Sequence, residues 1–296
     1  MTTKQTATLE APGATLVYDV RPGDGTGDPT PLVLVGSPQG AEGFTSLAAR
    51  LPGRTLVTYD PRSERSTVHP GTAPATPATH VADIRRVVAA SAGITGHTGP
   101  VDVFATSGGA LNALAWISEH PGEVRTLVAH EPPVAHYLPD RDLMIAAMAD
   151  VADTYQAKGL GAGMAKFIAL VMHQGELPAD YLDRPAPDPA QFGLPAQDDG
   201  SRDDPLLGVG MRATPRFVPD DDALRAAAAS GRVILAQGEE SAQEMPGRSA
   251  AAAAARLGLP LAVFPGSHNG FMGGEYGQPA GKPEEFAAKL REVLAG

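Results

Sequence analysis

The chain has 296 residues, of which 43% are hydrophobic and 19% are charged, a balance that fits a globular protein with a large core. Its formal net charge of -11 argues against nucleic acid and anionic membranes as partners, because both attract basic surfaces. The absence of cysteine excludes disulfides, cysteine-based zinc sites and thiol nucleophiles, and nothing in the sequence calls for a metal or a cofactor. The N-terminal residues lack the apolar core of a signal peptide and no run is long enough to span a bilayer, so we expect a cytoplasmic protein. The sequence leaves the oligomeric state open, with a homodimer as one option.

The chain opens with two alternating segments, residues 5–10 and 14–20, around Pro12 and Gly13, which predicts a hairpin. Helical patterns separate most of the short apolar runs that follow. These runs are residues 31–36, 54–59, 100–104, 124–129, 232–237 and 260–264. Continuous apolar strands that alternate with helices are typical of a parallel sheet covered on both faces. We therefore predict an α/β fold with a mostly parallel, doubly wound sheet.

The alternation stops between about 132 and 222, where helical periodicity is followed by a Pro- and Asp-rich stretch from 178 to 205. We interpret residues 132–221 as a helical cap inserted into a core domain formed by residues 1–131 and 222–296. Ligands bind at the carboxyl edge of open α/β sheets. Four apolar side chains of the cap are candidates for lining a substrate pocket, and the alternative is that they form the cap's own small core. They are Met144, Met148, Phe167 and Met172.

The segment VDVFATSGGA, residues 101–110, predicts a nucleophile elbow. An apolar strand runs directly into Ser107, and the small residues Ala105 and Gly109 stand two positions away on either side. The apolar run after Ser107 predicts a buried helix whose N-terminus aims free N–H groups at the serine oxygen. The usual pattern is G-x-S-x-G, and alanine replaces its first glycine here. The alternative is a small-residue turn that merely packs.

A serine hydroxyl needs a base, and His268 is suitably placed, on a loop between the last apolar strand and the C-terminal helix. Two carboxylates are candidates for the residue that orients His268. Glu240 follows the strand at 232–237, and Glu131 follows the strand at 124–129. Both lie at the carboxyl edge, so the sequence leaves the choice open. The context favours Glu131, because a charge at the end of a buried strand is costly without a partner.

A developing oxyanion needs preorganised donors. One candidate is the N–H of Gly108, directly after the nucleophile. The second is the N–H of Ser37 in the segment GSPQG, which follows the strand at 31–36. Taken alone, GSPQG is equally typical of a plain turn.

Several segments together make the chain resemble a group of actinobacterial α/β-hydrolases, and the resemblance covers the core but hardly the cap. The segments are VGSPQGAEGF, VTYDPRSERST, VFATSGGALNALAW, VRTLVAHEPP and FPGSHNGF. The stretch TLVAHEPP also resembles the zearalenone lactonases, in which the glutamate of a His-Glu-x-Pro motif is the triad acid. This resemblance implies that Glu131 is the acid here. One departure is DPRSERS, which carries Ser63 and Glu64 where the relatives often have a glycine-containing turn.

These features favour a metal-free serine hydrolase that cleaves a small carboxylic ester or lactone through an acyl-enzyme, with Ser107, His268 and a glutamate as its triad. Amide hydrolysis, C–C bond hydrolysis and perhydrolysis would use the same residues. The alternative from another class is a small-molecule binding protein on a hydrolase scaffold, which the fold alone does not exclude.

Overall fold

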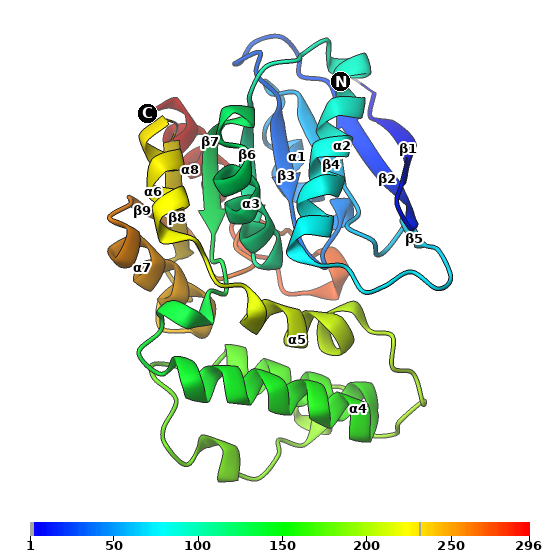
Figure 1. The fold of residues 1–296 in the computed structure, drawn as a ribbon, viewed down its shortest axis with the longest axis vertical. Coiled ribbons are helices and arrows are strands. Elements are labelled where there is room, and N and C mark those ends of the chain that lie inside the picture. The colour runs from blue at the N-terminus through cyan, green and yellow to red at the C-terminus, as the bar shows by residue number, and fades with distance from the viewer. Residues whose placement is uncertain (1–2, 231) are drawn as a thin grey trace.

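A computed structural model describes residues 3–230 and 232–296 and contains a mixed sheet with helices on both faces (Figure 1). The strand order is β1-β2-β4-β3-β6-β7-β8-β9, and the short β5 pairs with β2. β1 and β2 form an antiparallel hairpin and β2 pairs antiparallel with β4, whereas all pairs from β4 to β9 are parallel. The strands are β1 (Gln5–Ala11), β2 (Ala14–Arg21), β3 (Leu32–Val35), β4 (Leu56–Tyr59), β5 (Thr67–Val68), β6 (Val101–Thr106), β7 (Val124–His130), β8 (Arg232–Gly238) and β9 (Leu261–Phe264).

Two hydrophobic clusters fill the space between the sheet and its helices. Four helices cover one face: α2 (Pro77–Thr95), α3 (Gly108–Glu119), α6 (Asp221–Ser230) and α7 (Met245–Leu257). The short α1 (Thr45–Ala49) and the C-terminal α8 (Pro283–Ala295) cover the other. Local sequence signals set the helix ends, since α2 begins with a capping box at Thr76 and ends at Gly96 in the left-handed conformation. The α/β fold class and the parallel sheet predicted from the sequence are confirmed, whereas β5 was not anticipated.

The chain between β7 and β8 contains no strand within residues 132–230 and is largely helical. Its longest helix, α4 (Arg141–Val171), breaks at Gly159, where φ is +83° and the Asp198 carboxylate would lie 2.1 Å from an added Cβ. After it come the π-helix η6 (Pro205–Gly210) and α5 (Met211–Ala213). Figure 1 shows α4 and α5 below the sheet, on the side towards which β7 points. The division into a core and a cap after residue 131 stays a prediction.

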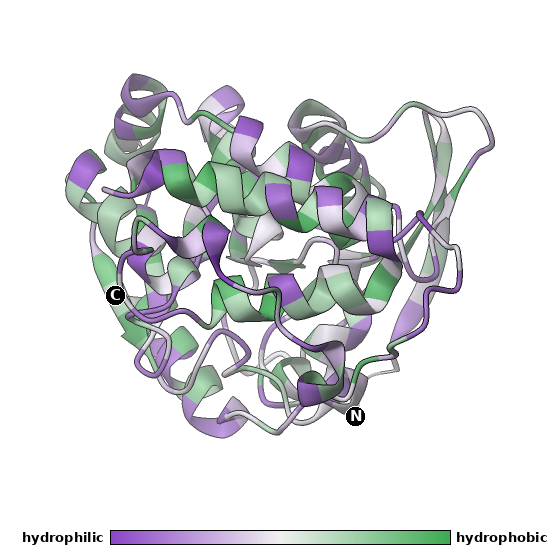
Figure 2. Cartoon of the chain, turned by 90° about the horizontal axis from the view of Figure 1, so that it is seen from below, coloured by the Kyte–Doolittle hydropathy of each residue, from purple (hydrophilic) through white to green (hydrophobic). Residues whose placement is uncertain are grey.

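Hydrophilic and hydrophobic residues alternate along the helices of this segment, as Figure 2 shows from below. Within the described parts of the chain, no helix has both the length and the apolar character needed to cross a membrane.

We predict that a broad-specificity protease used sparingly cuts first within residues 183–205. None of these residues is buried, so the local segment opens without exposing a core. Mass spectrometry of the first fragments measures the cleavage sites. First cuts within 100–130, which contains β6, α3 and β7, would contradict this expectation.

Candidate active site

Ser107 lies between β6 and α3 in a strained backbone conformation, with φ +55° and ψ -131°. Non-glycine residues rarely adopt a positive φ, so the surrounding contacts must hold it there. The Ser107 N–H donates to the carbonyl of His130 at 3.0 Å, and the Ser107 carbonyl accepts from the N–H of Ala110 at 2.9 Å. The sharp turn leaves Ser107 only half-buried at the carboxyl end of the strand. This is the geometry expected of a nucleophile elbow.

The two glycines after Ser107 allow the elbow to pack directly on the end of β3. A Cβ on Gly108 would lie 2.6 Å from the carbonyl oxygen of Ser37, and one on Gly109 would lie 2.4 Å from that of Val35. Ser37 precedes Pro38 through a cis peptide bond. The structure therefore brings together Ser37 and Gly108, the two residues predicted to supply the oxyanion donors.

His268 and Glu131 are joined by a hydrogen bond of 2.5 Å between Nδ1 and Oε2. Glu131 is fully buried and has a φ of +48°, which is rare for a residue with a side chain. Its other oxygen, Oε1, accepts from the N–H of Gly238 at 2.8 Å and from the hydroxyl of Ser241 at 2.5 Å. The His268 side chain is 29% exposed. Among the described residues no hydrogen bond joins His268 to Ser107, and the hydrogen bond to Glu131 orients the ring.

The hydrogen bonds of Glu131 decide its protonation. Burial by itself raises the pKa of the carboxyl, but the hydrogen bond with His268, the neighbouring imidazoles and the Ser241 hydroxyl together lower the pKa to about 2. Glu131 is therefore an anion at neutral pH, and its negative charge faces the His268 ring.

The buried side chain of His130 packs next to Glu131 and His268. Its ring stacks on that of His268 with centroids 6.1 Å apart, and Thr106 Oγ1 lies 3.1 Å from its Nδ1. Burial lowers the pKa of His130 to about 4, so the ring is neutral at pH 7. Four phenylalanines surround it: Phe104, Phe264, Phe271 and Phe286. Because the Ser107 amide bonds to the His130 carbonyl, this residue places the elbow and the His268 ring next to each other.

Glu240, the second acid candidate, does not contact His268 in the described structure. Its carboxylate is 52% exposed and pairs with Lys282 at 2.7 Å. The neighbouring Ser241 is fully buried and bonds to Glu131 instead. Sequence reasoning missed Ser241, although a hydroxyl just after a strand at the carboxyl edge was a signal. The structure thus brings Glu131, and not Glu240, to the imidazole.

The four cap residues predicted to line a substrate pocket lie in different surroundings. Met144 and Met148 are 1% and 3% exposed within a separate hydrophobic cluster of the helical segment, and Phe167 packs against that cluster. Met172 is 59% exposed. The burial of Met144 and Met148 fits the alternative that they form the cap's own core, and a role of these four residues towards substrate stays a prediction.

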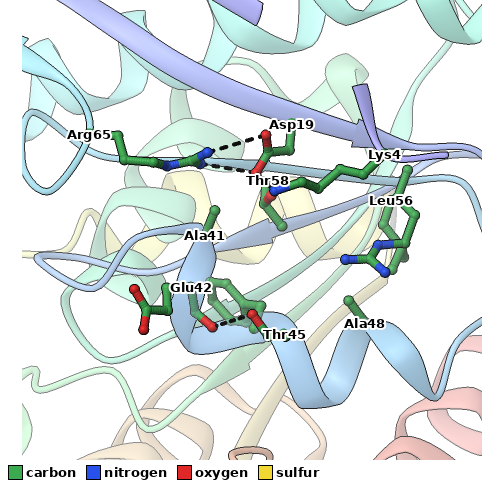
Figure 3. Close-up of a pocket in the computed structure, with 11 residues that line it drawn as sticks. Lys4, Asp19, Ala41, Glu42, Thr45, Ala48, Leu56, Thr58 and Arg65 are labelled. Carbon is green, nitrogen blue, oxygen red and sulfur yellow. Dashed lines mark hydrogen bonds and ion pairs between the residues drawn. The ribbon is translucent and has the colours of Figure 1, made fainter. Parts of the chain in front are cut away.

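A separate pocket of about 250 Å³ lies between β2, β4 and α1 (Figure 3). Arg65 pairs with Asp19 at its wall, and none of the predicted catalytic residues lines it. Within residues 3–230 and 232–296, no group of three His, Asp or Glu side chains is arranged to hold a metal ion.

Comparisons with known proteins agree with this architecture. No family model matches the chain. It is 26% identical over 293 residues to the uncharacterized hydrolase YraK of Bacillus subtilis, covering 97% of this chain and 95% of that protein. A thermophilic esterase from Thermogutta terrifontis superimposes with a TM-score of 0.64 at 19% identity, covering 98% of both chains. The enol-lactonase from Burkholderia xenovorans gives a TM-score of 0.60 at 16% identity, covering 98% of this chain and 100% of that one. The chain therefore has an α/β-hydrolase fold.

In this fold, the residues predicted for catalysis and the Gly238 N–H that binds Glu131 all lie at the carboxyl ends of five neighbouring strands, β3, β6, β7, β8 and β9. Ser107 follows β6 and Glu131 follows β7, while His268 stands on the loop after β9. The neighbouring strands β3 and β8 supply Ser37 and the N–H of Gly238. Since the carboxyl ends of parallel strands meet at one edge, residues far apart in sequence form one site.

We predict that Gly109→Ala destabilises the protein by about 1–3 kcal/mol, because the added methyl group would overlap the backbone at the end of β3. Gly122→Ala is the matched control, since nothing lies within 4 Å of a Cβ there. Urea unfolding followed by circular dichroism measures both free energies. Equal stability of the two variants would contradict the close packing of the elbow on β3.

Proposed function

We propose that the protein is a serine hydrolase that cleaves a carboxylic ester or lactone through an acyl-enzyme. The observation that carries the proposal is the hydrogen bond between the buried Glu131 and His268, located beside a strained serine at the end of β6. An ionised carboxylate that fixes a histidine near an elbow serine is the arrangement that activates a hydroxyl as a nucleophile. The resemblance to an esterase and an enol-lactonase supports the same substrate class.

In the first half-reaction, Ser107 Oγ attacks the carbonyl carbon of the ester while His268 Nε2 takes the hydroxyl proton. The carbonyl becomes a tetrahedral oxyanion, which the N–H groups of Ser37 and Gly108 stabilise. Glu131 stabilises the imidazolium and keeps Nδ1 protonated. The C–O bond then breaks, the leaving oxygen takes the proton from His268, and the acyl group stays on Ser107. In a lactone the alcohol so formed remains attached to the acyl chain.

In the second half-reaction, water replaces the alcohol. His268 takes one proton from the water as its oxygen attacks the acyl carbon, and the same two N–H groups meet the second oxyanion. Collapse releases the carboxylic acid and returns the proton to Ser107 Oγ. The reaction balances with one water consumed for each ester bond cleaved, and it needs no metal or cofactor.

We expect Ser107→Ala to abolish turnover of p-nitrophenyl esters, with a loss of about a thousandfold or more, because the variant lacks the nucleophile. The midpoint of thermal unfolding should stay unchanged, since removal of one half-exposed hydroxyl leaves no buried cavity. Steady-state kinetics and labelling by a fluorophosphonate measure the outcome. Near-normal turnover by a folded Ser107→Ala protein would reject the proposal, and tight ligand binding by an unlabelled wild type would favour a binding protein.

The acid is tested by comparing two glutamates. Glu131→Gln should lower kcat by about a thousandfold, because a neutral amide does not stabilise the imidazolium and favours the wrong tautomer. Glu240→Gln is the matched control and should change kcat by less than about threefold, because its carboxylate pairs with Lys282 at the surface. Rates at saturating substrate, with folding verified by circular dichroism, measure the difference. The opposite ranking would assign the triad acid to Glu240.

A further inference from the structure

The loop after β4 holds the loop that carries Ser37. We call residues 36–41 the oxyanion loop. Within it, the carbonyl of Pro38 accepts from the Ser63 hydroxyl at 2.7 Å, and the N–H of Gly40 donates to Glu64 Oε1 at 2.9 Å. The N–H of Ala41 donates to Asp60 Oδ1 at 2.8 Å. Three side chains of one neighbouring loop therefore fix the backbone that follows Ser37.

Glu64 also binds the loop that carries His268. The Tyr276 hydroxyl donates to Glu64 Oε1 at 2.6 Å, so one carboxylate oxygen accepts from both Gly40 and Tyr276. Tyr276 stands in η8 (Glu275–Gly277), between His268 and α8. The segment of Tyr276 also contacts α1, where the N–H of Ser46 donates to Glu275 Oε1 at 2.7 Å.

The backbone around these contacts is specialised for them. Glu64 and Tyr276 have φ values of +53° and +58°, conformations that cost energy for residues with side chains. A Cβ on Gly40 would lie 2.4 Å from Asp60 Oδ1 and 2.5 Å from Glu64 Oε2, so only glycine permits this approach. A glycine in place of Glu64 would relieve the strain but would lose both hydrogen bonds. A turn with glycine at this position would direct the chain equally well. The chain has Glu64 there instead, in a left-handed backbone conformation.

We propose that Glu64 is a positioning residue that couples the oxyanion loop to the loop of His268, so that the Ser37 donor and the general base keep one relative placement. The proposal rests on the proposed function, in which Ser37 and His268 act on the same reacting carbonyl. Glu64 touches no reacting atom and acts through Gly40 and Tyr276. Because an oxyanion donor stabilises the transition state more than the ground state, Glu64 acts on kcat and not on KM.

The first test compares Glu64→Ala, which removes the acceptor of both hydrogen bonds, and Tyr276→Phe with Tyr137→Phe. Tyr137 is the matched control, because its hydroxyl also donates to a carboxylate from a distant segment, Asp221 Oδ1 at 2.5 Å, and not to Glu64. We expect kcat per fluorophosphonate-titrated site to fall about tenfold in Glu64→Ala and about threefold in Tyr276→Phe, with KM changed by less than about twofold. Tyr137→Phe should leave kcat within about twofold of wild type.

The second readout is the inhibition constant of a trifluoromethyl ketone, whose tetrahedral adduct places an oxyanion on the same donors. We expect this constant to rise about tenfold in Glu64→Ala, in parallel with the loss of kcat. A variant that only folded less well would instead give a smaller titrated fraction with unchanged constants per site. The double variant Glu64→Ala, Tyr276→Phe should match Glu64→Ala alone, because Tyr276 acts through Glu64.

The possible failures are distinguishable. If Ser107→Ala stays active, the proposed function falls and this inference falls with it. If Ser107→Ala is inactive while Glu64→Ala retains the wild-type kcat and inhibition constant, the role of Glu64 alone is overturned. If the effects of Glu64→Ala and Tyr276→Phe multiply in the double variant, the coupling between the loops is overturned.

Discussion

The hydrogen bond between Glu131 and His268 is the constraint on which the arrangement of the site depends. A carboxylate with no exposed surface is strongly unfavourable unless its charge is compensated, and here each oxygen is satisfied. The partners come from different segments: Gly238 at the end of β8, Ser241 just after it, and His268 after β9. Compensating one buried charge therefore fixes the relative positions of three neighbouring strand ends, and the loop with the imidazole is located by the same bonds.

Most of the sheet could be predicted because apolar runs and the helical periodicity between them are local signals in the sequence. The elbow and the histidine could be located because both follow the end of an apolar strand, which a local pattern indicates. The sequence left Glu131 and Glu240 open, since both follow strands that end at the same edge. What distinguishes the two glutamates is the direction in which each side chain points. A φ of +48° turns the Glu131 side chain inward, whereas Glu240 pairs with Lys282, 42 positions further along the chain. The contact of Ser241 with Glu131 and the burial of Met144 depend on tertiary packing in the same way, so no local pattern shows them.

Backbone strain is concentrated around this edge. Among the described residues, those other than glycine with positive φ are Arg62, Glu64, Ser107, Glu131 and Tyr276. Ser107 and Glu131 belong to the proposed triad, and Glu64 and Tyr276 bond to each other beside the oxyanion loop. Arg62 forms a buried ion pair with Asp83 at 2.6 Å, which holds the loop after β4 against α2. Strained backbone conformations persist only where surrounding contacts outweigh their cost in free energy. The rest of the fold must therefore stabilise this edge of the sheet.

The position of Glu131 in the chain links catalysis to the helical segment. Pro132 and Pro133 follow it immediately and lead into that segment, and the Pro132 carbonyl accepts from the buried Ser249 hydroxyl of α7 at 2.8 Å. Two consecutive prolines restrict the backbone, and α7 anchors the first of them. A hinge at this entry would rotate the carboxylate away from the imidazole whenever the helical segment moved. The stiff entry separates the two, so that the hydrogen bond between Glu131 and His268 does not depend on the shape of the helical segment.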